Sequence, residues 1–331
     1  DPDEAEHAGM PHSAIESVHV DYVLPAVQMG VQLKRYVSFC QAHGPLSAQS
    51  IAQAETSDLT PILDLMRKEI KHDFRRYRKA TLMRRIQRRM GLHQLDQLSD
   101  YHAMLADNPK EREALRCDLL IGVTRFFRNP EAWEVLEKKV IRPMMESRRG
   151  TPIRVWCAGC ATGEEAYSIA MVLFEQLPVD QHKLPFQIFA TDVAEDALAF
   201  ARTGVYPESI MKDVPLERLR RFFKKESGGY RVSKQLRESV VFARQNVLAQ
   251  PPFAKLDLIL CRNLLIYLER EAQERVMKVF QFALKQGGVL FQGSSESVGL
   301  ASDLYESVAR KHRIWRRNGM KAWPPIDSGY P

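Results

Sequence analysis

The sequence predicts an α/β protein in which a small all-helical domain precedes a doubly wound parallel sheet. Apolar, β-favouring runs alternate with helical patterns after residue 146, and such alternation is typical of a parallel sheet covered by helices. A loop of small residues follows the first of these runs, as at the ligand site of doubly wound folds. Residues 59–145 show helical spacing without strand signals. A length of 331 residues suffices for both domains.

The first 58 residues differ from both domains. Residues 1–40 combine a short helical pattern, the run Tyr22–Pro25 and an amphipathic helix, with too few apolar residues for a core of their own. Residues 41–58 are polar and contain Gly44-Pro45, so we expect a linker there. At the other end of the sequence, residues 321–331 are expected to form a tail.

The helical domain, residues 59–145, carries a concentration of positive charge. Residues 67–89 hold eleven lysines and arginines against two acidic residues, a net +9, although the whole chain is only +7. A change in phase of the apolar residues predicts a break near residues 78–80 and a short helix from Thr81 to Met90 that exposes its arginines. We interpret this surface as the binding site of an acidic partner; a solvated helix face is the alternative. The arginines expected to bind the partner are Arg75, Arg76, Arg84, Arg85, Arg88 and Arg89.

The segment Thr124–Arg128 has the unusual sequence TRFFR and precedes a helix opened by Asn129-Pro130. An arginine held by buried aromatic residues is well placed to act on a ligand rather than to move in solvent. We therefore expect this segment to belong to a functional site. A hinge at a domain interface is the alternative.

The central motif is Ile153–Ser168, a buried strand, a loop of small residues and a helix. Thr162 and Glu165 fit a capping box, with Gly163 and Glu164 as the first helical residues. Two glutamates in a first turn repel phosphate and favour a cationic ligand. The motif therefore points away from NAD and ATP and toward S-adenosylmethionine, which has a sulfonium and an ammonium group. Ordinary complementarity to the helix dipole is the alternative.

Further strand-like runs complete the predicted sheet. Phe186–Ala190 is the expected second strand. Asp192 follows this strand and is expected to bind the ribose hydroxyls of a ligand; a surface turn is the alternative. An antiparallel excursion is expected over residues 222–240, with a hairpin at Gly228-Gly229 and a strand returning over Val232–Val240. The remaining predicted strands are Val240–Ala243, Leu256–Leu260, Val289–Phe291 and a closing hairpin of Tyr305–Arg310 with His312–Arg316.

Cysteine content and the length of apolar runs indicate the cellular compartment and argue against metal binding and membrane insertion. Five scattered cysteines suit a reducing cytoplasm better than a disulfide framework. Cys157 and Cys160 form a C-x-x-C without a second pair, so we expect no metal site. Apolar runs are core-sized, which predicts no insertion into a membrane.

Five motifs, in order, resemble those of the CheR-type chemotaxis receptor glutamate O-methyltransferases. They are TRFFR, WCAGCATGEEAYS, FATD, QNV and CRNLLIYLE, and the resemblance extends from Leu59 to Arg317. It implies a Rossmann-like class I methyltransferase domain over residues 146–320, with the antiparallel subdomain inserted. It also implies S-adenosylmethionine as donor, S-adenosylhomocysteine as product, and glutamates on chemoreceptor cytoplasmic helices as acceptors. The enzyme would be cytoplasmic and recruited to membrane receptor arrays.

The resemblance also assigns roles to residues. Arg128 and Tyr267 would be catalytic, beside the acceptor carboxylate, and the basic helix would dock on the receptor. Glu164 would face the methionine part of the donor, Asp192 the ribose, and Asn246 and Val247 the adenine. The full donor-binding set is Thr124, Arg128, Gly159, Glu164, Asp192, Asn246, Val247, Cys261, Arg262 and Asn263.

Two departures from the family pattern are visible. Gly122 stands where many members have asparagine, so one hydrogen bond to the donor is missing or comes from the backbone. The hairpin at Glu226–Tyr230 is short, and we predict that no tethering receptor peptide is needed. In addition, His7–Val37 resembles the C-terminal end of CheB-type methylesterases, which suggests a fusion to an upstream methylesterase domain; an unrelated arm is the alternative.

Two other functions compete with receptor methylation. A sensory module that binds the donor without turnover is the first. A nucleic-acid methyltransferase is the second, but such enzymes typically follow the fourth strand with an Asn/Asp-Pro-Pro-aromatic loop to hold a flipped base. Here Cys261-Arg262-Asn263 occupies that position, so we expect no nucleic-acid partner.

Overall fold

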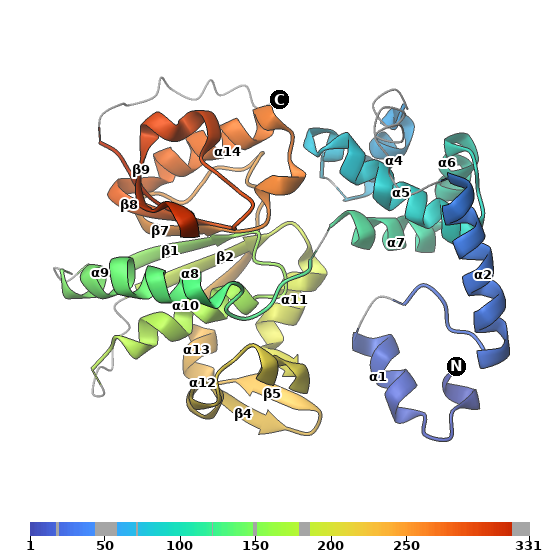
Figure 1. The fold of residues 1–331 in the computed structure, drawn as a ribbon, viewed down its shortest axis with the longest axis horizontal. Helices are drawn as coiled ribbons and strands as arrows, with labels where there is room; N and C mark the ends of the chain where they lie inside the picture. The colour runs from blue at the N-terminus through green and yellow to red at the C-terminus, as the bar shows by residue number, and fades with distance from the viewer. Residues whose placement is uncertain are drawn as a thin grey trace. The chain divides into compact units, whose positions relative to one another are not determined.

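The computed structural model describes residues 1–17, 20–43, 58–70, 72–120, 122–147, 151–178 and 186–319. It consists of two compact units, whose boundary falls between residues 121 and 122 (Figure 1). Within the described residues, no helix combines the length and the apolar character needed to cross a membrane.

The first unit is helical. Its core consists of side chains that are almost fully buried, among them Met66, Phe74, Ile86, Tyr101 and Leu105. The helical pattern is interrupted between α4 and α5, but α5 begins at Lys79, within the break predicted near residues 78–80, and is longer than the expected Thr81–Met90. The helices are α1 (Gly9–Ser17), α2 (Ala26–His43), α4 (Thr60–Ile70), α5 (Lys79–His93), α6 (Leu98–Asp107) and α7 (Pro109–Leu119).

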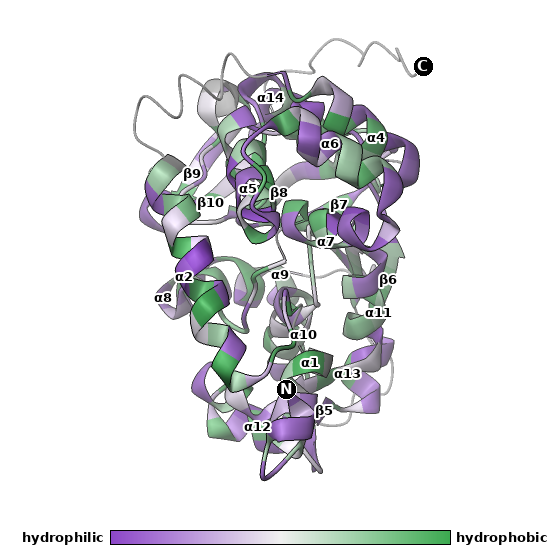
Figure 2. Ribbon diagram, turned by 90° about the vertical axis from the view of Figure 1, so that its right-hand side faces the viewer, coloured by the Kyte–Doolittle hydropathy of each residue, from purple (hydrophilic) through white to green (hydrophobic). Residues whose placement is uncertain are grey.

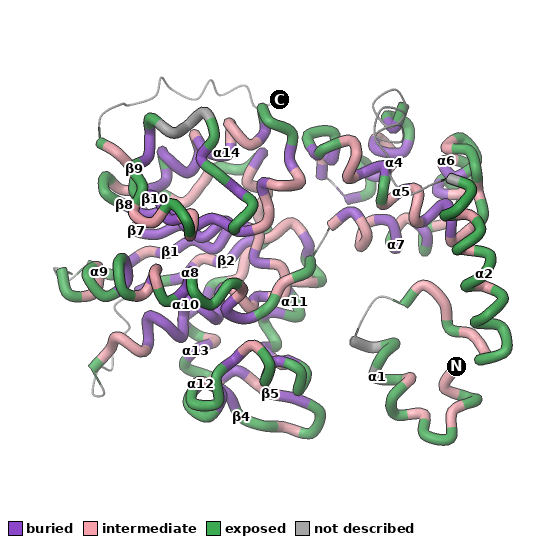
Figure 3. Tube along the Cα trace, viewed as in Figure 1, coloured by how far each residue is buried: buried purple, intermediate pink, exposed green. Residues whose placement is uncertain are grey.

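Helices α1 and α2 lie largely outside that core (Figure 3). Hydrophobic and hydrophilic residues are interspersed along α2 (Figure 2), and Val27, Val31 and Leu33 are all more than half exposed. The opposite side of α2 lies on α5, where Gly91 leaves so little room that a Cβ atom would come within 2.7 Å of the Phe39 ring. Helix α2 therefore rests on the helical domain without a core of its own.

The second unit begins earlier than residue 146, where the sequence placed the start of the α/β domain. Helix α8 (Pro130–Leu136), the π-helical turn Glu137–Ile141 and α9 (Arg142–Glu146) belong to it. The reason is packing, because Trp133, Leu136 and Ile141 are buried in the same core as the first strand. Helical pattern alone does not tell which core a helix covers.

The main sheet has seven strands in the order β6-β2-β1-β7-β8-β10-β9. The first five are parallel, and β10 pairs antiparallel with β8 and β9. All the strands expected for this sheet are present, most of them longer than predicted. Their bounds are β1 Ile153–Ala158, β2 Phe186–Asp192, β6 Val240–Arg244, β7 Leu256–Cys261, β8 Leu284–Gln292, β9 Tyr305–Ala309 and β10 Ile314–Arg317.

Helices cover both faces of this sheet, as the predicted doubly wound fold requires (Figure 1). Along β1, Val155 and Cys157 belong to the core shared with α8 and α10 (Glu164–Glu175). Trp156 points to the other face, where its ring meets Phe280 of α14 (Arg270–Ala283) edge-on, with 5.5 Å between centroids. The alternation follows from the period-two geometry of a strand.

The inserted antiparallel sheet differs from the prediction. Its order is β3-β5-β4, from Val205–Pro207, Gly229–Val232 and Phe223–Glu226. The expected strand Val232–Val240 is wrong, because α13 (Lys234–Glu238) occupies it, with Ser233 as its N-cap. Strand β3 was not predicted, since three residues between α11 (Glu195–Thr203) and α12 (Leu216–Phe222) carry little pattern. Its pairing requires Gly229, whose Cβ would lie 2.2 Å from the Tyr206 carbonyl oxygen.

The strand order fixes where a ligand can approach. From β1 the chain moves to β2 and β6 on one side, then returns to β7 and β8 on the other. The connections therefore diverge between β1 and β7, and open α/β sheets bind ligands at the carboxyl ends of the strands at such a point.

Candidate active site

The loop after β1 is a tight turn of small residues. Gly159 has φ of 73°, and a Cβ atom there would lie 3.1 Å from the Leu264 side chain in the segment after β7. Gly163 has φ of 92°, and its Cβ would lie 2.8 Å from the Cβ of Ala201. Only glycine adopts both conformations without strain. The loops after β1 and β7 are thus in contact, as expected of a site at the switch point.

The predicted capping box is wrong. Gly163, in the left-handed conformation, is the N-cap of α10 and offers no side chain to cap it. The Thr162 hydroxyl instead lies 2.7 Å from the Glu164 carboxylate and donates to it. Burial raises the pKa of Glu164 above its ordinary value, while this hydrogen bond lowers it. The Glu164 carboxylate is thus held at the loop, available to a cationic ligand.

Asp192 closes the loop from the end of β2. Its two carboxylate oxygens accept hydrogen bonds from the backbone N–H groups of Ala161, at 2.8 Å, and Ala194, at 3.0 Å. Burial raises its pKa, and these N–H groups oppose the shift. Each carboxylate oxygen has two lone pairs, so acceptor capacity remains for hydroxyl groups of a ligand. The segment after β6 lies beside it, because Gln245 N–H donates to the Asp192 carbonyl at 2.9 Å.

The next residues on this segment are Asn246 and Val247, which are partly exposed. The Asn246 side-chain oxygen accepts from the Leu248 N–H at 2.9 Å, which fixes the side chain in the turn.

The TRFFR segment is anchored by its two phenylalanines. Phe126 and Phe127 are 1% and 4% exposed, and the Phe127 N–H donates to the Ser168 hydroxyl of α10 at 3.1 Å. Thr124 and Arg128 on either side of them are partly exposed. This anchoring agrees with the expectation that buried aromatic residues hold the arginine.

The segment after β7 is held by a carboxylate that the sequence analysis missed. Glu296, 4% exposed, accepts hydrogen bonds from the backbone N–H groups of Asn263, Leu265 and Gly293, at 2.7–2.8 Å. These bonds fix Asn263, at φ of 61°, and the turn Leu265–Tyr267 that carries Tyr267. The only signal in the sequence is a glutamate after the small residues that follow β8, which alone does not indicate this role.

Arg262 points inward from the same segment. Its side chain is 1% exposed, and its Nη2 donates to the Arg128 carbonyl at 2.8 Å and to Asn129 Oδ1 at 3.1 Å. Its Nη1 lies 3.6 Å from a carboxylate oxygen of Glu165, whose side chain is 12% exposed. Burial raises the pKa of Glu165 to about 7, and the positive charge of Arg262 opposes the shift.

Three cysteines, two in strands of the sheet and one in the loop after β1, are unsuited to chemistry as thiolates. Cys157, Cys160 and Cys261 are free and buried, and burial holds the pKa of each thiol well above its usual range. In the described parts of the chain, no group of three or more His, Cys, Asp and Glu side chains is arranged to hold a metal ion.

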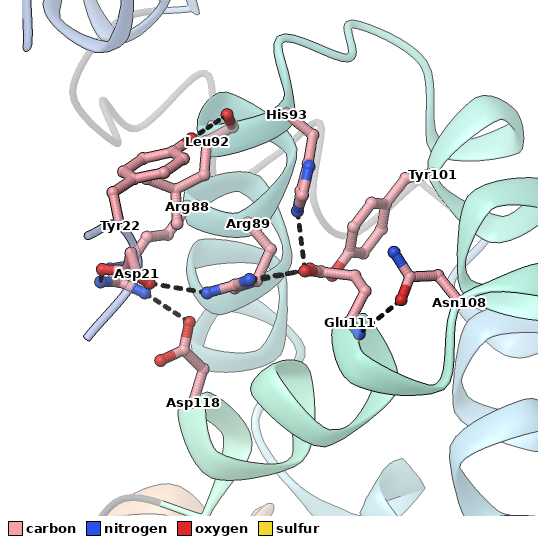
Figure 4. A network of polar contacts seen from close by, with 10 residues as sticks. All are labelled: Asp21, Tyr22, Arg88, Arg89, Leu92, His93, Tyr101, Asn108, Glu111 and Asp118. Carbon is pink, nitrogen blue, oxygen red and sulfur yellow. Dashed lines mark hydrogen bonds and ion pairs between the residues drawn. The ribbon is translucent and has the colours of Figure 1, made fainter. Parts of the chain in front are cut away.

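Two arginines of the basic helix α5 pair with acidic residues, so this helix is less exposed than predicted (Figure 4). Arg89 is 5% exposed, because its guanidinium pairs with the buried Glu111 carboxylate, with Nε 2.8 Å from Oε1. The Tyr101 hydroxyl and His93 also bond to Glu111. The expectation that Arg89 lies on the exposed face is therefore wrong.

Arg88 is also engaged. It pairs with Asp118 of α7 at 2.6 Å and with Asp21, which also pairs with Arg89 (Figure 4). Arg75, Arg76 and Arg84 are exposed and Arg85 is partly so. Arg75 forms an ion pair with Asp73 at 2.7 Å. The exposed basic surface thus includes Arg84 but not Arg89.

Comparison with known proteins identifies relatives for both units. The model described as CheR methyltransferase, SAM binding domain, matches residues 122–314, and the one described as CheR methyltransferase, all-alpha domain, matches residues 57–120. Chemotaxis protein methyltransferase 2 of Pseudomonas aeruginosa is 34% identical, over 68% of this chain and 81% of its own length. A chemotaxis protein methyltransferase of Listeria innocua is 36% identical, over 54% of this chain and 67% of its own.

A third relative is longer than this chain. A 104.1 kDa protein encoded in the hypE 3' region of Rhodobacter capsulatus is 36% identical over 99% of this chain. The chain spans 37% of the length of that protein.

Proposed function

Since the chain belongs to the CheR methyltransferase family, we propose that it methylates glutamate side chains on the cytoplasmic helices of bacterial chemoreceptors. The observation that carries this proposal is the meeting of four segments at one edge of the sheet. The loop after β1 contacts Leu264 after β7, Asp192 bonds to Ala161, and Arg262 bonds to the Arg128 carbonyl. The enzyme would act in the cytoplasm, at membrane receptor arrays.

The residues at this edge suit S-adenosylmethionine. Gly159 lets the loop after β1 pack closely on Leu264, at the carboxyl ends of the strands where ligands of such sheets bind. The carboxylates of Glu164 and Asp192 suit the ammonium group and the ribose hydroxyls of the donor. Thr124 and Arg128, Asn246 and Val247, and the backbone of residues 261–263 would complete the binding site. The donor supplies an electrophilic methyl group.

The acceptor needs alignment rather than activation. A glutamate carboxylate has an ordinary pKa near 4.3 and is ionised at neutral pH, so it would attack the methyl carbon without a general base. The S–CH3 bond of the sulfonium would break as the O–CH3 bond forms, and a neutral thioether would leave. The residues of the chain have only to align the carboxylate and exclude water, which would otherwise screen the reacting charges. Arg128 and Tyr267 would hold the acceptor carboxylate. A tight ion pair would weaken the nucleophile, so we assign Arg128 to positioning and alignment of the reacting groups.

The test is transfer of a labelled methyl group from S-adenosylmethionine to a panel of receptor cytoplasmic fragments, scored as base-labile methyl ester. Label that is lost in alkali supports esterification. Arg128→Ala should lower kcat by about 100-fold or more. Arg125→Ala is the matched control, because Arg125 lies in the same segment with its side chain 56% exposed and should leave kcat unchanged. Near-normal turnover of Arg128→Ala would remove that residue from the mechanism.

The same assay separates the competing functions. Donor binding by calorimetry without label on any receptor would favour a sensory module.

The receptor would dock on the exposed arginines of the first unit, Arg84 foremost. The resemblance of His7–Val37 to the end of a methylesterase remains a prediction; a longer relative that contains the whole matched region is compatible with a fused upstream domain.

A further inference from the structure

A buried ion pair connects the segments that carry the candidate site. Arg262 follows β7, Glu165 lies in the first turn of α10, and the Arg262 guanidinium donates to the backbone at Arg128. Glu165 Oε1 and Arg262 Nε and Nη1 are buried without a hydrogen-bond partner. The two side chains stabilise each other's charge, because an isolated buried charge is strongly unfavourable.

The guanidinium is held on its flat face as well as at its edge. It lies 4.5 Å from the centroid of the Phe291 ring and 5.6 Å from that of Trp133. The Trp133 indole N–H also donates to the Arg128 carbonyl, at 3.1 Å. The Arg128 carbonyl therefore receives hydrogen bonds from two buried, rigid donors.

The backbone around Arg128 needs this support. Phe127 and Asn129, its two neighbours, have φ of 46° and 60°. Left-handed conformations are costly for residues other than glycine and persist only where the surroundings enforce them. Without the bonds to its carbonyl, the segment would relax and the Arg128 side chain would leave its position.

We propose that Arg262 is a positioning residue, which together with Glu165 holds the backbone at Arg128 so that the Arg128 side chain meets the reacting groups. This inference rests on the proposed methyl transfer. It assigns the Arg262 side chain to the protein interior rather than to a donor contact. Arginine is required, because its planar fork serves Glu165 and the carbonyl at once while its face stacks on an aromatic ring, which lysine does not reproduce.

The first variant is Arg262→Lys, measured in the full chain. We expect kcat for receptor methylation to fall about 10- to 100-fold, the loss typical of a small misplacement of a catalytic group. KM for the receptor should change far less. Glu165→Gln should lower kcat in the same direction, and the double variant should lose less than the product of the single losses.

Two further measurements separate positioning from a general structural role. In an Arg128→Ala background, Arg262→Lys should change kcat by less than about twofold, because the residue through which it acts is absent. The indole N–H resonance of Trp133, assigned with Trp133→Phe, should shift in Arg262→Lys, because both side chains bond to one carbonyl. An equal loss of kcat with and without Arg128 would overturn the proposal.

Loss of S-adenosylhomocysteine binding with an unchanged Trp133 resonance would also overturn it, in favour of a donor contact. The resonance and the product binding need no acceptor, so they decide the role of Arg262 even if receptor fragments are not methylated. A failure to methylate receptor fragments would count against the proposed function alone. If Arg262→Lys does not fold, Glu165→Gln still carries the test.

Discussion

Replacing Glu165 by glutamine should change how the stability of the second unit depends on pH. Burial raises the pKa of this carboxyl from its ordinary value of 4.5 to about 7 in the native structure. Each pKa unit corresponds to about 1.4 kcal/mol, so the native structure disfavours the ionised side chain by about 3 kcal/mol. A raised carboxyl pKa contributes stability below 4.5, and this contribution is lost as the pH rises toward 7.

The assay is urea unfolding of both proteins at several values from about pH 5 to about pH 8. All four tryptophans lie at or after residue 133, so tryptophan fluorescence follows the second unit. Relative to Glu165→Gln, the wild-type free energy of unfolding should fall by about 2–3 kcal/mol across this range. Glu195→Gln, in the first turn of α11 with its side chain 55% exposed, is the control and should follow the wild type. Parallel curves for Glu165→Gln and the wild type would refute the reasoning.

Three further predictions concern other parts of the molecule. Glu111→Gln should destabilise the helical unit by about 3 kcal/mol, because it leaves a buried arginine without its partner; far-UV circular dichroism during urea unfolding measures this. Since the native pKa of Glu111 is lowered to about 2, the wild-type advantage over this variant should persist above pH 4.5 and shrink as the pH falls toward 2. Arg84→Glu should raise KM for an acidic receptor helix several-fold with kcat unchanged, and an unaltered KM would place docking elsewhere. Gly163→Ala should lower stability by about 1–2 kcal/mol or more through its positive φ and the contact with Ala201, whereas Gly228→Ala, with a similar φ of 93° and open space around it, should lose less in thermal melts.

The central strands of the main sheet could be predicted because they are almost completely buried and are therefore nearly continuous apolar runs, as in Leu256–Cys261. Strand β3 could not, because its three residues are defined by the close approach of Gly229 to Tyr206, a contact between distant positions. The same limit applies to the site. The small residues after β1 predict the loop. No local pattern distinguishes Glu296, which accepts hydrogen bonds from three backbone N–H groups in segments far apart in the sequence.

The arginines of α5 show a different limit. Charge counting predicts a basic surface, but it does not tell which guanidinium pairs with a buried carboxylate. Arg89 lies one residue from Arg88 and faces Glu111, so its charge is neutralised inside the domain. A helix turns by about 100° per residue, and one position therefore separates a partly exposed arginine from a core arginine.

The contacts of residues 20–43 with α5 have a practical consequence for exchanging modules between relatives. The family region of the helical domain begins at residue 57, but Asp21 pairs with Arg88 and Arg89, Tyr22 donates to the Leu92 carbonyl, and Phe39 covers Gly91. In a chimera joined at residue 57, a foreign segment would replace residues 20–43 beside these groups, or the groups would be exposed to water. A junction placed before residue 20 keeps the pairs together, so the unit that is inherited as a family region is smaller than the unit that should be transplanted.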